Sequence, residues 1–440
     1  MAHSLEQYKQ AFANARRPLG GSSDLAQTRE AALSRFLTLG FPTTRDEEWR
    51  FTSVAPIAER VFTLPQTSPA ARHRDIVPLR SADVFGAELV FVDGRLAPAL
   101  SSTDALPRGV RAGSLADLIA GGADGIGSHL ARVALFDRRP FVAFNTAFFA
   151  DGAYIHVPAH TIVEKPIHVV FISTGETNGP AMSHPRVLAV LGDDSQAAVV
   201  ESYAGPDGAE YFTNVVTEIV LGQNAVLDHY KLQHESAQAY HVGTIVLETG
   251  RSASCASHSV SLGGALVRND VIAILAGEGG ECTLNGLYLA DGQRLIDNHT
   301  TIDHAMPHCD SREIYKGILA DRARGVFNGK IIVRPDAQKT DAKQTNRALL
   351  LSEDAQVNSK PELEIFANDV KCTHGAAVGQ LDPDALFYLR SRGFDLAEAR
   401  HLLIHAFAGD VLNRMPLVAV RNGVESVLQR QLAHALAAAA

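Results

Sequence analysis

A short sequence pattern recurs through the middle of the chain and constrains the fold more than any other feature. Each copy has an apolar strand end, a polar or glycine-rich turn, a small residue and a resumed alternation of apolar and polar residues. The copies begin at Leu191, Leu221, Leu247, Leu275, Leu319 and Leu351. Most successive copies start roughly 25 to 32 residues apart, which is typical of solenoid repeats. Because the repeats contain strand patterns only, they predict a parallel β-helix, with a flat β-sandwich as the alternative.

Helical patterns flank the strand repeats on both sides. Apolar residues recur at helical spacing between residues 5 and 39, and Gly40 ends this region. After residue 384 the strand pattern stops, and Asp395 is placed to cap a helix over residues 396–412. We therefore predict a helical or mixed N-terminal region at 1–140, a β-helix core at 141–383 and a C-terminal helical domain at 384–440. The C-terminal helices would either cap the exposed last rung of the solenoid or dock a partner.

The overall composition is that of a folded protein without a strongly basic surface. Of 440 residues, 46% are hydrophobic and 20% are charged, and the formal net charge is −9. This acidic balance argues against nucleic acid or an anionic membrane as the main partner. No stretch approaches the roughly 18 apolar residues that a membrane span needs, and the N-terminus lacks the apolar core of a signal peptide. We therefore expect a cytoplasmic protein.

The cysteines and the absence of two common motifs limit the kinds of functional site that we expect in this chain. Cys255, Cys282, Cys309 and Cys372 include no Cys-x-x-Cys pair and are too few for a disulfide framework. Cys255 and Cys282 follow turns at equivalent points of successive repeats, which predicts buried structural thiols. The sequence contains no phosphate-binding glycine loop and no Gly-x-Ser-x-Gly elbow. We therefore expect this chain to bind no nucleotide.

The densest cluster of polar residues lies at 297–311. It contains residues of types that can bind metal, namely His299, Asp303, His304, His308 and Cys309. Their spacing matches neither a zinc finger nor a metalloprotease. Turn and rim residues of a solenoid are often polar for solubility alone, so a polar rim is favoured over a metal site.

Cys372 and His374 form the most distinctive pair, near the end of the repeats. In an extended strand, residues two apart face the same side, so the thiol and the imidazole would project together. A buried thiol beside a hydrogen-bonded histidine is the structural alternative. The spacing alone favours the structural pair over a functional one.

Several longer segments give the chain a family resemblance. They are residues 40–52, 145–152, 164–168, 327–331 (Phe-Asn-Gly-Lys-Ile), 339–341, 360–365 (Lys-Pro-Glu-Leu-Glu-Ile), 369–377 (Asp-Val-Lys-Cys-Thr-His-Gly-Ala-Ala) and 386–393. Together they resemble the SufB/SufD family of iron–sulfur cluster assembly proteins over nearly the whole chain. The resemblance implies a right-handed parallel β-helix and a non-enzymatic scaffold. A β-helical enzyme such as a polysaccharide lyase is disfavoured, because no secretion signal and no groove of clustered charges are visible.

Within this family the chain is more similar to the SufD component than to the SufB component. SufB carries its sulfur-accepting cysteine in a Gln-Cys-Asp-Ser segment, whereas the equivalent residues 344–347 read Gln-Thr-Asn-Arg. The resemblance implies that His374 lies at the SufB–SufD interface and contributes to nascent cluster assembly, with Cys372 beside it. His374 is then a candidate ligand for iron, or for a transient iron–sulfur cluster shared with SufB. The alternative is a purely structural partner of SufB with no cluster ligand of its own.

The resemblance also implies partners. SufB would pair with this chain through the two β-helices, and the SufC ATPase would bind the C-terminal helices. The candidate contact with SufC is the apolar helical face formed by Leu402, Leu403, Ala406 and Phe407. ATP hydrolysis would belong to SufC, in agreement with the missing phosphate loop. A homodimer could form when the chain is alone.

Overall fold

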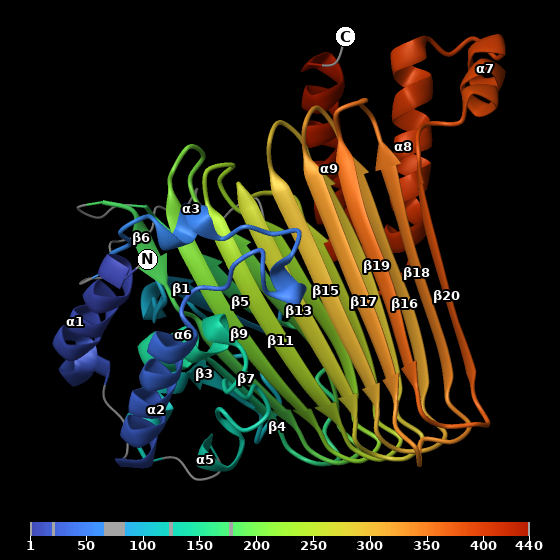
Figure 1. Ribbon diagram of the computed structural model, residues 1–440. Coiled ribbons are helices and arrows are strands. Elements are labelled where there is room, and N and C mark those ends of the chain that lie inside the picture. The colour runs from blue at the N-terminus through green and yellow to red at the C-terminus, as the bar shows by residue number, and fades with distance from the viewer. Residues whose placement is uncertain (1, 20–22, 66–83, 123–125, 176–178, 439–440) are drawn as a thin grey trace.

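The structure, a computed structural model, describes residues 2–19, 23–65, 84–122, 126–175 and 179–438. Two long sheets lie face to face and form a parallel β-solenoid, with helices in the N-terminal and C-terminal parts of the chain (Figure 1). The predicted β-helix is therefore confirmed. The alternative of a flat β-sandwich is wrong, because strands along both sheets pair in parallel rather than in the antiparallel manner of a sandwich.

Each sheet is a continuous ladder of strands. The first sheet runs in the order β2 (Arg95–Leu96), β1 (Ala87–Val92), β5 (Ile167–Ile172), β8 (Gln196–Ala204), β10 (Val226–His234), β12 (Ser254–Ser261), β14 (Glu281–Ala290), β16 (Asp310–Leu319), β18 (Asp341–Leu350), β20 (Lys371–Gly379). The second runs in the order β19 (Gln356–Ile365), β17 (Arg324–Val333), β15 (Leu295–His304), β13 (Leu266–Leu275), β11 (Tyr240–Thr249), β9 (Tyr211–Leu221), β7 (Arg186–Leu191), β4 (Gly152–Val157), β3 (Arg111–Ser114). The short strand β6 (Ala181–Ser183) pairs with β9.

The interior of the solenoid is built from stacked, in-register positions. From β8 onward, the strands of the first sheet start about 30 residues apart, which is the repeat seen in the sequence. Parallel pairing puts Leu227, Cys255 and Cys282 side by side on β10, β12 and β14. All three are buried, and burial raises the pKa of Cys255 to about 12. The prediction of buried structural thiols is confirmed.

Turns of one conformation recur between the strands. Asp194, Asn224 and Ser252 have φ values of 54°, 53° and 53°. Asp and Asn adopt this left-handed conformation at lower cost than most other residues with a side chain. Each of the three backbone N–H groups donates to a carbonyl oxygen of the following turn. The polar turns that mark the repeats therefore form a hydrogen-bonded ladder along one edge of the solenoid.

N-terminal helices pack on the outer face of the second sheet (Figure 1). They are α1 (Ala2–Leu19), α2 (Ser23–Leu39) and α6 (Pro140–Phe148). The same part of the chain also contains shorter helical elements, namely η1 (Glu47–Trp49), α3 (Ala55–Ala58), η4 (Pro98–Leu100), α4 (Leu115–Ala120) and α5 (Ile126–His129). Tyr8, Phe36 and Phe144, one from each long helix, pack their rings together. Trp49 is buried with its ring 5.3 Å from that of Phe141, so it anchors the segment that follows α2.

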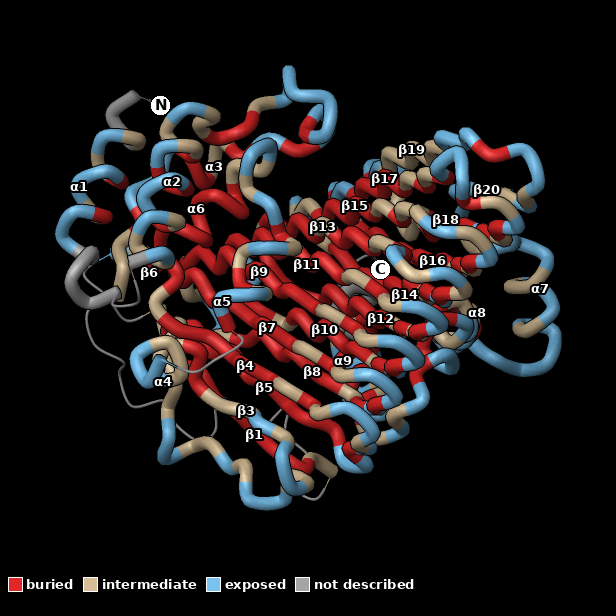
Figure 2. The backbone as a smooth tube through the Cα atoms, turned by 90° about the horizontal axis from the view of Figure 1, so that it is seen from below, coloured by how far each residue is buried: buried red, intermediate tan, exposed pale blue. Residues whose placement is uncertain are grey.

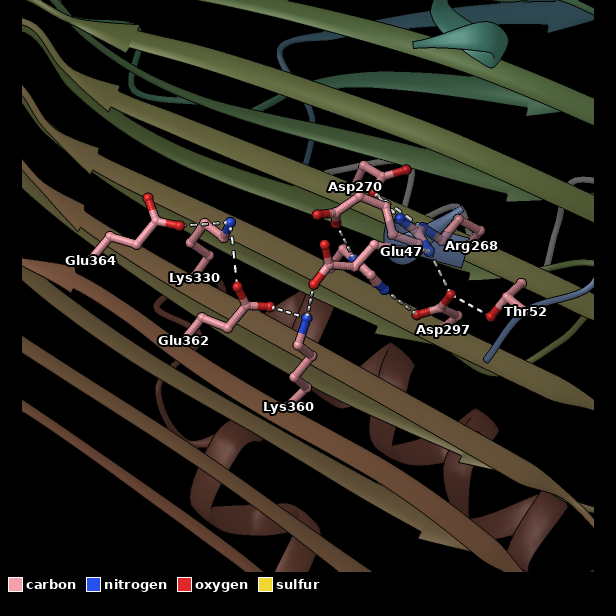
Figure 3. Close-up of polar contacts among 11 residues, drawn as sticks. Glu47, Thr52, Arg268, Asp270, Asp297, Lys330, Lys360, Glu362 and Glu364 are labelled. Carbon is pink, nitrogen blue, oxygen red and sulfur yellow. Dashed lines mark hydrogen bonds and ion pairs between the residues drawn. The ribbon is translucent and has the colours of Figure 1, made fainter. Parts of the chain in front are cut away.

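The same segment, residues 43–54, is also held to the second sheet by polar contacts (Figure 3). The Thr52 hydroxyl donates a hydrogen bond to the buried carboxylate of Asp297 on β15. Closer to the end of the solenoid, Lys360 of β19 pairs with Glu47 at 2.9 Å. The N-terminal region therefore reaches along the second sheet as far as its last strand.

Of the C-terminal helices, the two longer ones lie along the side of the solenoid. The C-terminal helices are α7 (Pro383–Ser391), α8 (Leu396–Leu412) and α9 (Val418–Ala438). As predicted, Asp395 caps α8, in a capping box with Glu398. Ile404 and Ala408 pack α8 on the outer face of the first sheet, over β14 and β16. The alternative in which these helices cap the last rung is therefore wrong. Across the described ranges, none of the helices is long and apolar enough to span a bilayer.

Candidate functional site at the open end of the solenoid

The solenoid ends in two strands that each lack a neighbour on one side. Within the described part of the chain, β20 pairs only with β18, and β19 pairs in its sheet only with β17. Figure 2 shows buried residues along the middle strands and intermediate or exposed residues along these two. We call the pair β19 and β20 the open end. Its unpaired N–H and C=O groups are a template on which another chain can pair.

The register of β20 identifies the side chains that lie over the interior. In β18, Ala342 and Gln344 point inward, with exposed fractions of only 0% and 2%. Their direct partners in β20 are Cys372 and His374. The structure therefore places both candidate residues on the inner face of the last rung, directly above buried positions.

Cys372 is half-buried in apolar surroundings. It packs with a cluster that includes Ile331, Ala342 and Leu363. Burial raises the pKa of its thiol. Because the thiolate, not the thiol, is the metal ligand and the nucleophile, Cys372 in the free chain is a neutral packing residue.

His374 is exposed at the open end. Its imidazole has no hydrogen-bond or ion-pair partner among the residues that the structure describes. A neutral imidazole is a normal ligand for iron. However, no group of three His, Cys, Asp or Glu side chains that could hold a metal occurs in the described ranges. His374 can therefore supply only part of a metal site, and another chain would have to complete it.

Exposed apolar side chains surround this part of the solenoid. Ile365, Phe366 and Val378 have exposed fractions of 39%, 61% and 49%. They lie at the ends of β19 and β20, beside the unpaired edges. An exposed apolar group next to an unpaired strand is typical of a protein–protein contact and is an aggregation risk when left uncovered.

Further exposed apolar side chains lie on α7, on the connection between α7 and α8, and on the first half of α8. They are Phe387, Tyr388, Phe394, Leu396 and Leu402, with exposed fractions of 75%, 56%, 41%, 48% and 42%. We call these five residues the helix patch. Of these five residues, only Leu402 was predicted from the sequence as a contact with SufC. The adjacent aromatic residues Phe387 and Tyr388 on a short helix were the signal that could have identified the rest, because one short helix cannot bury both of them.

The four predicted SufC-contact residues differ in their exposure to solvent. Leu402 and Ala406 are exposed, whereas Leu403 and Phe407 are half-buried. Phe407 packs toward the first sheet, where the ammonium of Lys316 lies 4.4 Å from the centre of its ring. Lys316 also donates a hydrogen bond to the Phe407 carbonyl oxygen at 2.9 Å. The Phe407 side chain therefore packs against the first sheet and is not part of an exposed face.

The polar residues at 297–311 do not converge on one point. Asp297 and His299 lie on the outer face of β15, where Arg268 pairs with Asp297 at 2.7 Å. His304 points inward instead and lies 2.9 Å from the hydroxyl of Ser311. The favoured interpretation as a solenoid rim is wrong for residues 297–304, which form a strand. The alternative of a metal site also has no support in this geometry.

Two family models match the chain. One describes the SufBD protein N-terminal region and matches residues 2–169; the other describes the SUF system FeS cluster assembly SufBD core domain and matches residues 171–407. The chain belongs to the SufBD family. The resemblance seen in the sequence is confirmed.

Curated relatives agree with this assignment to the SufBD family. The chain is 34% identical over 416 residues to an iron–sulfur cluster assembly SufBD family protein of Synechocystis, covering 92% of this chain and 90% of the relative. It is 33% identical over 380 residues to the iron–sulfur cluster assembly protein SufD of Escherichia coli, covering 86% of each. A SufD of Bacillus subtilis is 30% identical over 303 residues, covering 67% of this chain and 68% of the relative. The chain is therefore a SufD-like member of a family of iron–sulfur cluster assembly proteins.

Proposed function

We propose that this SufBD-family chain is the cytoplasmic SufD-type scaffold subunit of a SufB–SufC–SufD complex, and that it catalyses no reaction of its own. The open end would pair with the β-helix of SufB. The observation that carries this proposal is the uncovered last rung, with its two unpaired strand edges and its exposed Ile365, Phe366 and Val378. Helices α8 and α9, which would otherwise be the obvious cap, lie along the side of the solenoid.

Within that interface, His374 would hold iron or a nascent iron–sulfur cluster as cargo, together with ligands from SufB. The exposed position of the imidazole and its lack of a described partner support this role. Cys372 is the secondary candidate, because it would first have to lose a proton that burial makes harder to remove. Two copies of the chain could pair through the same open end when SufB is absent.

A purely structural partner of SufB is the competing function. It is favoured because His374 belongs to no group of three or more metal-binding side chains within the described residues. The two functions differ in what loss of the imidazole does to cluster yield. If the chain is only a structural partner, the complex would assemble and load clusters equally well without the His374 imidazole.

The helix patch is the proposed contact for SufC. We expect Leu402→Asp to weaken SufC binding by about tenfold or more, because a carboxylate would be buried without a counter-ion in the interface. SufB binding should be unchanged, since the patch lies on α7 and α8 and not on the open end. Co-purification of the three subunits, followed by titration of SufC, measures both.

The matched control for Leu402→Asp is Leu135→Asp, because Leu135 is also exposed, at 55%, but lies outside the C-terminal helices. This control should bind SufC normally. Phe407→Asp is the wrong variant for this test, since it would disrupt packing against the first sheet. Normal SufC binding by the Leu402→Asp chain would show that SufC docks elsewhere.

A further inference from the structure

A line of polar side chains runs beneath His374 into the solenoid. Glu313 of β16, Gln344 of β18 and His374 of β20 occupy the same register position in three neighbouring strands. Glu313 and Gln344 are buried, with exposed fractions of 4% and 2%, whereas His374 is exposed. The exposed imidazole therefore stands at the outer end of a buried polar column.

The two buried members of the column are joined by a hydrogen bond. The Gln344 Nε2 group donates to Glu313 Oε2 at 2.8 Å. Only the amide nitrogen of a glutamine can donate, so a carboxylate on one side fixes which end of the carboxamide faces it. The Gln344 carboxamide is therefore held with its nitrogen toward Glu313.

The other end of the same carboxamide is unsatisfied. Gln344 Oε1 is buried and has no hydrogen-bond partner among the described residues. A buried acceptor that stays unpaired is destabilising, because it has lost its hydrogen bonds to water without replacing them. His374 is the residue of the next strand at this register position, and a neutral imidazole carries one N–H donor.

We propose that Gln344 is a positioning residue for His374. The two side chains are not hydrogen-bonded in the structure, but Gln344 Oε1, held in place by Glu313, is available to accept the imidazole N–H once the ring turns toward it. That contact would leave the lone pair of the other ring nitrogen free at the open end. Metal-binding histidines usually donate a hydrogen bond from the N–H of the second ring nitrogen in this way, which fixes the tautomer and the orientation of the ring. That the free nitrogen receives iron rests on the proposed function. The positioning itself does not depend on it.

The tautomer of His374 tests the proposal in the full chain without any cluster. Nitrogen-15 labelling of histidine with long-range proton–nitrogen spectra distinguishes the two tautomers, and loss of one signal in His374→Ala assigns the residue. The spectra are recorded near pH 8.5. Burial raises the pKa of Glu313 to about 7, so its carboxylate is ionised at that pH. We expect one tautomer in the wild-type chain, with widely separated nitrogen shifts.

Two variants remove the positioning contact and one retains it. In Gln344→Met, which keeps the length of the side chain, the His374 shifts should move to the averaged values of free histidine. Glu313→Leu should have a similar effect, because nothing then fixes the carboxamide. Glu313→Gln should keep the single tautomer, since its amide oxygen still accepts from Gln344 Nε2. Averaged shifts in the wild-type chain, or a single tautomer that persists in Gln344→Met, would overturn the proposal.

This test separates the positioning role from the proposed function. If the tautomer is fixed but His374→Ala leaves cluster yield unchanged, Gln344 positions His374 and the ligand role fails. If the tautomers average but His374→Ala abolishes cluster formation, the ligand role stands and the inference about Gln344 fails. Each outcome therefore bears on one claim alone.

Discussion

Replacing His374 with alanine should lower the iron and sulfide content of the reconstituted SufB–SufC–SufD complex by roughly tenfold or more, a loss typical of disrupted metal sites. The complex itself should still form, because His374 is an exposed side chain and the strand edges that would pair are backbone groups. Co-purification checks assembly, and iron and sulfide assays after reconstitution check cluster loading.

The matched control for His374→Ala is His160→Ala. His160 is also exposed, but it lies in a turn near the start of the solenoid, between β4 and β5. Its replacement should leave cluster content unchanged. An intact complex with normal cluster content in the His374→Ala variant would leave this chain as a structural partner only.

Replacing Arg186 with methionine should cost about 3 to 5 kcal/mol of the free energy of unfolding, the usual effect of leaving a buried charge without its partner. Arg186 and Glu218 are fully buried and pair at 2.6 Å, between β7 and β9. Glu218 also accepts hydrogen bonds from the backbone N–H groups of Ala131, Val133 and Ala134. Loss of the guanidinium would leave this carboxylate charged in the packed region between the sheet and the segment before α6.

Urea denaturation followed by circular dichroism measures the effect of Arg186→Met. Arg334→Met is the control, because Arg334 also pairs with a carboxylate, that of Asp303, but its side chain is 53% exposed. Exposed pairs contribute about 0 to 1 kcal/mol, so this variant should unfold close to the wild-type midpoint. Equal shifts for the two arginine variants would show that burial of the Arg186 pair does not matter to stability.

The β-solenoid could be predicted because its signal is repeated along the chain. Each repeat needs a turn residue that tolerates a left-handed conformation, and positions such as Asp194 and Asn224 recur for that reason. Helix α8 could be placed because its cap is local in sequence, as Asp395 and Glu398 are three residues apart. Local rules of this kind do not require knowledge of what packs against the element.

The packing faces could not be predicted in the same way. Helix α8 carries apolar residues around most of its circumference, so the sequence did not reveal that Ile404 and Ala408 face the solenoid while Leu402 faces outward. Likewise, alternation along β15 sends Asp297 outward and His304 inward, which separates residues that look like one cluster in the sequence.

The candidate site was only partly visible in the sequence. Strand spacing put Cys372 and His374 on one face, and the last repeat put them at the end of the solenoid. The buried pair beneath them was not visible, because Glu313 and Gln344 come from different repeats and meet only through the register of three strands. Sequence spacing does not encode that register.

The most direct test of the claim that the open end is half of an interface is amide hydrogen exchange of residues 371–379. It is measured in the free chain, at a concentration where the chain is monomeric, and in the complex with SufB. We expect amides on the outer edge of β20, which do not bond to β18, to exchange fast in the free chain and roughly a hundredfold or more slowly in the complex. Equal exchange of these amides in both states would contradict the claim that SufB pairs with this edge.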